Sequence, residues 1–252
     1  MNAHPSAPTG PPSVAAAIPA YQAAAAVADV ARRTLSLVAG GTLAELLVVD
    51  DGSTDGTAAA AREAGARAIS LPENRGKGRA LAAAFADLFP RGHAAVVTLD
   101  ADGQHLPEEV PRLVAAWRDA PEGERPHLVL GSRAHLFDEM SPLRRASNRC
   151  SSLLIGGAAG LDLADVQSGF RLYDRELIDA VGFPEARFEA ESAIVVRAVR
   201  AGFRIAVVPV SLGFADGRAT SHYRPLVDSL RIAGAVTAAR LDAFRWVRER
   251  SS

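Results

Sequence analysis

Short runs of apolar and β-branched residues alternate along this chain with longer stretches whose apolar residues recur at helical spacing. The runs ELLVVD and VVTLD lack strict polar–apolar alternation, so we expect these strands to be buried on both faces. Strands of this kind separated by helices predict an α/β fold with a mostly parallel sheet and helices on both faces. The predicted strands are 14–18, 45–50, 66–71, 93–100 and 127–132, and the predicted helices are one ending near residue 39, 57–65, 78–89, one beginning at Pro107, 142–159 and 188–201.

The two ends of the chain differ in pattern from this alternating part. Residues 1–13 are rich in Pro, Ser and Ala without Lys or Arg, which predicts a disordered tail and not a signal peptide. No stretch offers the roughly 18 uninterrupted apolar residues that span a bilayer, so we expect a cytoplasmic protein. The segment 224–252 is predicted to be an amphipathic helix. It either packs against the domain or rests peripherally on an anionic membrane surface.

Composition narrows the classes of partner. The net charge of −1 provides no basic field for nucleic acid, so we expect no nucleic-acid partner. The single cysteine, Cys150, excludes an internal disulfide and every multi-cysteine zinc pattern. At 252 residues with 48% hydrophobic content, the chain is long enough to bury a substantial core.

Two acidic clusters follow predicted strands, VVDDGSTDGT after the second and DADGQH after the fourth. In open α/β sheets, ligands bind outside the carboxyl ends of the strands, so both clusters are expected to face one crevice. Asp100 and Asp102 are one residue apart, and two carboxylates so close require a positive group between them. With Gln104 they form an oxygen donor set suited to Mg²⁺ or Mn²⁺, which also bridges a diphosphate. A pair of solvated loop acids is the alternative.

Three other motif assignments fail on single residues. An EF-hand counted from Asp51 requires Glu at its twelfth position, where Arg62 stands. NRGKGRA resembles a phosphate loop, but Lys77 is followed by Gly78 and not by Ser or Thr. No G-x-G-x-x-G follows the first strand, so a dinucleotide-binding fold has no fingerprint.

Several motifs occur in an order that resembles family 2 glycosyltransferases of the GT-A fold. They are AAIPAYQ, LLVVDDGSTDGT, NRGKGRALAAAF, VVTLDADGQH, GSR, DVQSGFRLY and SHYRPLVDSLRI, and they span roughly residues 14–232. The chain is most similar to the polyprenyl-phosphate sugar transferase branch, typified by dolichyl-phosphate mannose and glucose synthases. The resemblance implies a GT-A domain over 14–223, in which the irregular part after about Phe137 forms an acceptor-side subregion.

The resemblance also implies roles for individual residues. Where the family usually has Asn-Glu after the tyrosine, this chain has Gln22 and Ala23, which leaves the base of the nucleotide open between UDP and GDP. The implied roles are Pro19 and Tyr21 at the nucleobase, Asp51 at the nucleoside, Asp100, Asp102 and Gln104 at the metal and diphosphate, Arg133 at the acceptor phosphate, and Asp165 in the acceptor motif.

The residues themselves suggest further candidates, each with a structural alternative. Lys77 adds positive charge near the diphosphate. Glu191 in FEAES is either a catalytic carboxylate, second to Asp165 as a general base, or an acid that favours a helix start. His222 either touches phosphate or is structural. Arg144, Arg145 and Arg149 either cradle a phosphate group or form a solvated helix face.

We therefore expect an inverting, metal-dependent glycosyltransferase. Its donor is a nucleoside-diphosphate sugar, and its acceptor is a lipid-type polyprenyl phosphate. A hydroxyl group of a lipid, polyketide or saccharide is the alternative acceptor. A sugar-nucleotide nucleotidyltransferase normally carries a glycine-rich signature after the first strand, which IPAYQAAA lacks. A non-catalytic nucleotide-sugar binding module is a further alternative, against which the intact D-x-D argues.

Overall fold

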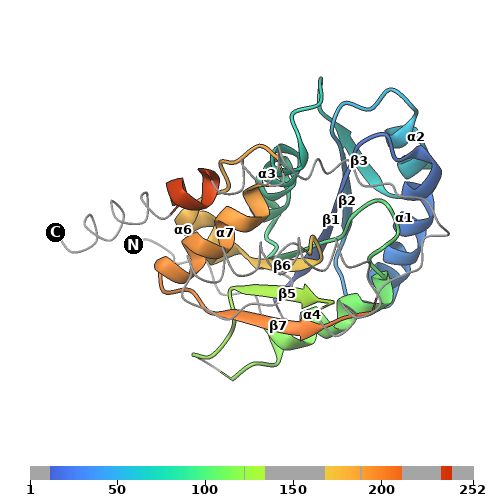
Figure 1. Cartoon of the computed structure of the whole chain (residues 1–252). Helices are drawn as coiled ribbons and strands as arrows, with labels where there is room; N and C mark the ends of the chain where they lie inside the picture. The colour runs from blue at the N-terminus through green and yellow to red at the C-terminus, as the bar shows by residue number, and fades with distance from the viewer. Residues whose placement is uncertain (1–11, 122, 134–167, 188, 212–233, 240–252) are drawn as a thin grey trace, which may run out of the picture.

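The computed structural model describes residues 12–121, 123–133, 168–187, 189–211 and 234–239. Its centre is a seven-stranded sheet in the order β3-β2-β1-β4-β6-β5-β7 (Figure 1). The strands are β1 (Val14–Ala20), β2 (Leu46–Asp50), β3 (Arg67–Ser70), β4 (Ala95–Thr98), β5 (Leu128–Ser132), β6 (Arg171–Asp174) and β7 (Ile205–Pro209).

Most neighbouring strands run parallel, which confirms the predicted α/β sheet. β1 pairs in parallel with β2 and β4, β2 with β3, and β5 with β7. The exception is β6, which lies antiparallel between β4 and β5. β6 and β7 are not among the strands that the sequence pattern predicts. β6 has only four residues, RLYD, and two of them are charged.

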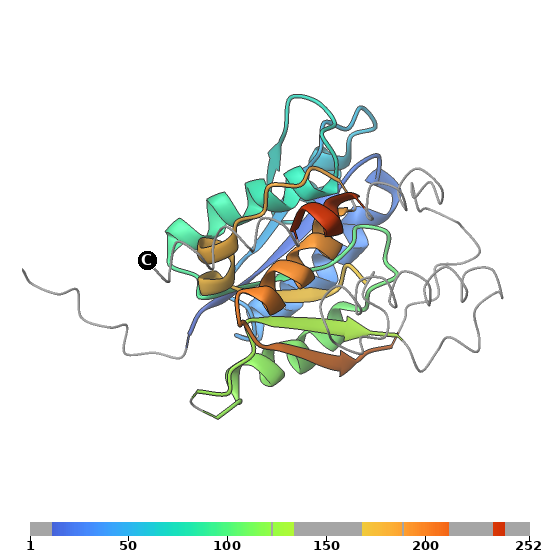
Figure 2. The same cartoon turned by 60° about the vertical axis from the view of Figure 1, so that its left-hand side comes forward.

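Helices cover both faces of the sheet, as the lack of alternation in its strands predicts (Figures 1 and 2). Within β1, Val14, Ala16 and Ile18 face one core cluster, whereas Ala15 and Ala17 face the other. The first cluster packs against α1 (Ala24–Ala39), α2 (Thr57–Glu63) and α4 (Val110–Arg118). The second packs against α3 (Lys77–Leu88), α6 (Arg175–Val181) and α7 (Glu189–Arg200).

Two short 3₁₀ turns adjoin these helices. η1 (Phe89–Arg91) follows α3, and η2 (Pro107–Glu109) leads directly into α4. The helix predicted to begin at Pro107 is therefore confirmed, because proline favours the first turn of a helix. The predicted helix at 142–159 lies outside the described residues, as does most of 224–252. Residues 234–239 are helical, and Val236 and Ala239 are buried against the α3–α7 face.

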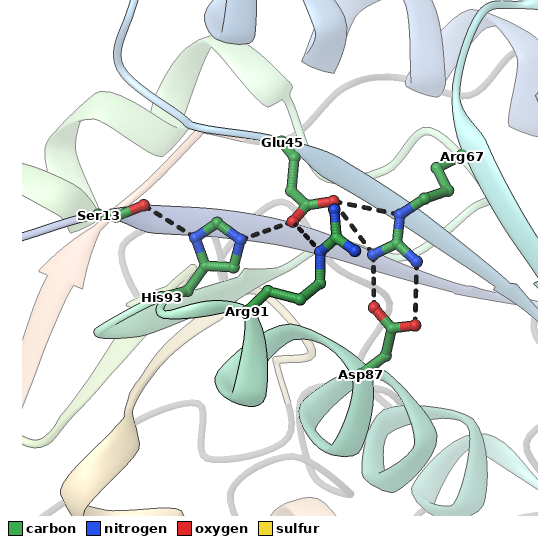
Figure 3. Close-up of polar contacts among 6 residues, drawn as sticks. All are labelled: Ser13, Glu45, Arg67, Asp87, Arg91 and His93. Atoms are coloured by element: carbon green, nitrogen blue, oxygen red, sulfur yellow. Dashed lines mark hydrogen bonds and ion pairs between the residues drawn. The ribbon is translucent and has the colours of Figure 1, made fainter.

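A polar network ties together the amino ends of the parallel strands (Figure 3). Glu45, just before β2, accepts hydrogen bonds from Arg91 Nε at 2.8 Å and Arg67 Nε at 3.1 Å, and its Oε1 lies 2.6 Å from His93 Nε2. His93 Nδ1 lies 2.8 Å from the hydroxyl of Ser13, the last residue of the predicted tail. Asp87 at the end of α3 completes the group with an ion pair to Arg67. This network holds the sheet from the end opposite to both acidic clusters.

None of the helices in the described part of the chain is both long enough and apolar enough to cross a bilayer.

Candidate active site

The carboxyl ends of the parallel strands and the beginning of β6 lie along one edge of the sheet. Ala20 at the end of β1 pairs with Asp50 at the end of β2, and Thr98 at the end of β4 pairs with Arg171 at the beginning of β6. Both acidic clusters continue from this edge. The predicted convergence of Asp51 with the D-x-D on one side of the sheet therefore follows from the observed register.

Lys77 lies at the centre of this edge. Its Nζ is 2.6 Å from Asp100 Oδ1 and 3.0 Å from Glu191 Oε1. The Glu191 side chain is 6% exposed and that of Lys77 13%. Burial alone would raise the pKa of Asp100, but the Lys77 ammonium together with other nearby charges lowers that pKa to about 2. The positive group expected beside the D-x-D is therefore present within the chain itself.

Two glycines seat Lys77 at the first turn of α3. Gly76, with φ of 97°, lies where a Cβ would overlap Arg187, and a Cβ on Gly78 would overlap the backbone at Glu185. The loop before α3 therefore packs directly on the segment that leads into α7. Since α7 carries Glu191, this close packing brings the two charged side chains together.

The segment 168–171 packs against Lys77 and Asp100. The sequence did not predict this contact with the D-x-D. A Cβ on Gly169 would overlap Lys77 Nζ and lie 2.9 Å from both carboxylate oxygens of Asp100. The Thr98 hydroxyl donates to the Gly169 carbonyl at 2.8 Å. Arg171 is fully buried and donates to the carbonyls of Ser168 and Glu191. The only sequence signal for the close approach of this backbone to Lys77 and Asp100 is QSGF, which places small residues before β6.

His105 holds the D-x-D loop through the backbone of Asp100. The Asp100 backbone N–H donates to His105 Nδ1 at 3.1 Å, which requires that nitrogen to be unprotonated. The imidazole is buried and stacks on Phe170 with ring centroids 5.4 Å apart. The histidine is therefore part of the loop's packing, a role that the sequence reasoning missed.

Asp102 and Gln104 form a turn at the rim of the site. Asp102 Oδ1 accepts a hydrogen bond from the Gln104 backbone N–H at 3.0 Å, and both residues are half-buried. Their carboxylate and amide oxygens are the hard donors that Mg²⁺ and Mn²⁺ prefer, so the residue types fit such an ion. Within the described ranges, no group of three or more His, Cys, Asp or Glu side chains is arranged to hold a metal ion.

Asp51 supports the loop before α3. Its carboxylate accepts hydrogen bonds from the backbone N–H groups of Arg75 at 2.9 Å and Gly76 at 2.7 Å. The residue is 3% exposed, and burial raises the pKa of its carboxyl group despite these donors. Asp51 therefore positions the backbone that precedes Lys77.

The loops after β1 and β2 are joined at the predicted nucleoside side. Pro19 is buried within β1, and Tyr21 immediately after it is 36% exposed. Gln22 has a φ of 50°, and its side-chain amide donates to the Thr54 hydroxyl at 3.0 Å. Ala23, which caps α1 without a side-chain acceptor, is held through its N–H by the hydroxyl of Thr57 at 2.8 Å. The Asp55 carboxylate also accepts a hydrogen bond from the N–H of Ala24 at 3.0 Å, so the DDGSTDGT segment caps a neighbouring helix.

The remaining predicted site residues are only partly placed. Arg133, half-buried at the end of β5, is close enough that its charge helps to lower the pKa of Asp100. This places the predicted phosphate-binding arginine on the same edge as the D-x-D. Asp165, Arg144, Arg145, Arg149 and His222 lie outside the described residues, and their assigned roles stay predictions.

The fold and this edge define a class of protein. A mostly parallel sheet that carries a D-x-D beyond its fourth strand is the arrangement expected for a GT-A glycosyltransferase, and the pattern of glycosyl transferase family 2 matches residues 15–182. The chain belongs to this family and is a glycosyltransferase.

Named relatives narrow the similarity to one branch. The chain is 30% identical over 213 residues to an undecaprenyl-phosphate mannosyltransferase of Micrococcus luteus, covering 80% of this chain and 82% of that protein. It is 31% identical over 181 residues to a polyprenol monophosphomannose synthase of Mycolicibacterium smegmatis, covering 66% of this chain and 65% of that protein, which is less than two thirds of its length.

A solved structure supports the same fold. Glucosyl-3-phosphoglycerate synthase from Mycobacterium tuberculosis, in complex with Mn²⁺ and uridine-diphosphate-glucose, superposes with a TM-score of 0.68. The sequence identity is 25%, and the match covers 92% of this chain and 79% of that chain. These relatives confirm the resemblance to the polyprenyl-phosphate sugar transferase branch and the GT-A fold.

Proposed function

We propose that this protein transfers a sugar from a nucleoside-diphosphate sugar to a polyprenyl phosphate, with inversion at the anomeric carbon and with Mg²⁺ or Mn²⁺. The observation that carries the proposal is the meeting of the D-x-D with Lys77, Glu191 and the Arg133 charge on one sheet edge. The undecaprenyl-phosphate and polyprenol relatives support the lipid phosphate as acceptor. The solved relative that holds Mn²⁺ and UDP-glucose supports the class of donor.

On the donor side, Asp102 and Gln104 are the residues that would hold the divalent cation. A cation bound there would offset the charge that develops on the departing diphosphate. Lys77 holds Asp100 in place beside them. The nucleoside of the donor is proposed to contact Pro19, Tyr21 and Asp51. The proposal covers both UDP and GDP as the nucleotide.

On the acceptor side, a phosphate monoester already carries a negatively charged oxygen, so its attack on the sugar requires no general base. Arg133 is the proposed phosphate ligand, since guanidinium groups suit phosphate geometry. Arg144, Arg145, Arg149 and His222 are proposed to complete that cradle, and Asp165 to position it. The amphipathic segment 224–252 would then let a cytoplasmic enzyme reach a lipid head group from the membrane surface.

Glu191 favours one second candidate, transfer to a hydroxyl acceptor. A hydroxyl must lose its proton as the new bond forms, and a positioned carboxylate contributes about 10²–10⁴-fold to such a step. Glu191 is a buried carboxylate that shares the Lys77 ammonium with Asp100, and Asp165 is the other proposed base. The solved relative is named a glucosyl-3-phosphoglycerate synthase, and 3-phosphoglycerate carries a hydroxyl group.

Sugar transfer with labelled UDP- and GDP-sugars and Mn²⁺ tests both candidates. We expect a labelled lipid product with a C55 polyprenyl phosphate and no product with 3-phosphoglycerate. Asp102→Asn should lower the rate by on the order of a hundredfold, because the cation loses a charged ligand. The matched control is Asp179→Asn, which alters an exposed carboxylate on α6 and should leave the rate unchanged.

The other outcomes separate the alternatives. Product on 3-phosphoglycerate alone would establish the hydroxyl acceptor and overturn the lipid phosphate. Release of pyrophosphate from a sugar phosphate and a nucleoside triphosphate would establish a nucleotidyltransferase. Nucleotide-sugar binding without turnover on any acceptor would establish a binding module.

A further inference from the structure

Lys77 is the only lysine of the chain. The other 27 of its 28 Lys and Arg residues are arginines. Its ammonium contacts two carboxylates from different elements, Asp100 after β4 and Glu191 on α7. Both contacts lie within ion-pair distance, at 2.6 Å and 3.0 Å, so the ammonium charge is shared between two carboxylates. The one lysine ammonium in the protein is therefore committed to neighbouring side chains.

The space around Lys77 is shaped for a compact cation. A methyl group on Gly169 would already overlap Nζ, and a guanidinium is larger than an ammonium. Gly76 and Gly78 fix the backbone on either side of Lys77 against the segment 185–187. With only 13% of its side chain exposed, Lys77 has little surface left to offer to a bound diphosphate.

We propose that Lys77 is a positioning residue that neutralises Asp100, so that a divalent cation binds tightly only together with the donor diphosphate. This inference rests on the proposed metal-dependent function. It replaces the expectation, drawn from the sequence, that Lys77 adds its charge directly to the diphosphate.

Asp100, Asp102 and Glu191 bring three negative charges to this end of the sheet. Negative charge attracts a divalent cation even though no three of the described acidic side chains are arranged together as its ligands. Lys77 offsets the charges of Asp100 and Glu191. A cation is then left with Asp102 and Gln104 as its main protein ligands, so it needs diphosphate oxygens to complete its shell. Metal and donor diphosphate consequently bind and leave together.

Mn²⁺ binding without nucleotide tests this inference directly. In Lys77→Met the side chain keeps most of its length but loses its charge, so the negative charges of Asp100 and Glu191 are no longer offset. We expect Mn²⁺ alone, followed by the paramagnetic resonance signal of the free ion, to bind this variant about tenfold more tightly than the wild type. Sugar transfer should fall at the same time, because Asp100 loses its fixed position.

Two further variants serve as controls. Arg79→Met removes an exposed cation from the same helix and should leave Mn²⁺ binding unchanged. If Lys77→Met fails to fold because buried carboxylates are left uncompensated, Lys77→Met combined with Glu191→Gln removes one of those charges. That double variant should still bind Mn²⁺ alone more tightly than the wild type, since Asp100 is released in both.

The inference is overturned if the folded variants bind Mn²⁺ alone no more tightly than the wild type. Weaker binding of UDP and GDP by Lys77→Met without metal, at unchanged Mn²⁺ affinity, would instead identify Lys77 as a diphosphate ligand. Failure of the proposed function has a different signature. In that case wild-type protein shows no Mn²⁺-dependent binding of either nucleotide.

Discussion

Gly169 illustrates how much of this site depends on single atoms. The position where its Cβ would lie is occupied by Lys77 Nζ and is 2.9 Å from both Asp100 carboxylate oxygens. The φ of Gly169 is not in the left-handed region, so the constraint is steric and not conformational. The absence of a side chain allows β6 to begin directly beneath the D-x-D.

Gly169→Ala should therefore displace Lys77 from Asp100. We expect a loss of about 1–3 kcal/mol in the free energy of unfolding, as for other overpacked sites, and at least about a tenfold loss in sugar transfer. Denaturant unfolding and the transfer assay measure the two effects. The matched control is Gly234→Ala, a helical position with no atom within 4 Å of the new methyl group, where stability should rise slightly. Full activity in Gly169→Ala would contradict the packing argument.

The identity of the charged residues could be predicted from the sequence, but their partners could not. Composition and order placed Asp100, Asp102 and Gln104 at a ligand-binding edge and demanded a positive group nearby. That the positive group is Lys77 depends on contacts between residues 23 and 114 positions apart along the chain. Hydrophobic periodicity carries no information about such contacts, and neither His105 nor Gly169 has a spacing that would identify it.

At the scale of elements, the amino ends of the strands are fixed by charge. Glu45 is 20% exposed and is shared by Arg67, Arg91 and His93. Burial alone would raise the pKa of Glu45, but the hydrogen bonds from His93 and Arg91 and the charge of Arg67 lower it to about 2. One carboxylate thus joins the beginning of β3 to the segments that precede β2 and β4.

The lowered pKa of Glu45 predicts a pH dependence of stability. Since the folded protein holds this proton less tightly than the unfolded chain, the stabilisation is complete above about pH 4.5 and is lost as the pH falls towards 2. Glu45→Gln should cost about 1–2 kcal/mol at pH 7 and roughly half of that or less at pH 3. Urea unfolding at both pH values measures this difference.

An exposed pair provides the comparison for that experiment. Glu73 and Arg75 form an ion pair with side chains that are 64% and 59% exposed. Glu73→Gln should change stability by less than about 0.5 kcal/mol at either pH. An equal loss in both variants, or a loss in Glu45→Gln that is as large at pH 3 as at pH 7, would show that the network does not act through its charge.

The strands and helices that the pattern predicts are those with clear local signals. Helix α3 has regularly spaced apolar residues, and β2 and β4 are apolar runs ended by acids. β6 escapes prediction because Arg171 is buried by hydrogen bonds to the nearby carbonyl of Ser168 and the more distant carbonyl of Glu191, not by apolar character. Its antiparallel direction is likewise set by pairing with β4 and β5, which lie far away in the sequence.

In the whole molecule, the site lies where the strand direction changes. β1 to β4 form a parallel unit that carries the D-x-D, and the antiparallel β6 joins it to β5 and β7. The Lys77 and Glu191 pair crosses from α3 to α7 over this junction. The integrity of the site therefore requires both parts of the sheet to be docked.

The single lysine gives this docking a direct readout by proteolysis. A lysine-specific protease can cut the chain at one place only, after Lys77, and would release a 77-residue N-terminal fragment. In the folded protein this bond lies at the first turn of α3, between glycines packed against the segment 185–187. Cleavage consequently requires a local opening that separates α3 from the segment before α7.

We expect the native protein to be cut far more slowly than the denatured chain, and UDP or GDP with Mn²⁺ to slow the cut further by stabilising the closed form. Cleavage of the native protein as fast as the denatured chain would contradict this expectation. Because other bonds are immune to the protease, the band of the intact chain on a gel reports the fraction of molecules whose reaction centre has not yet come apart.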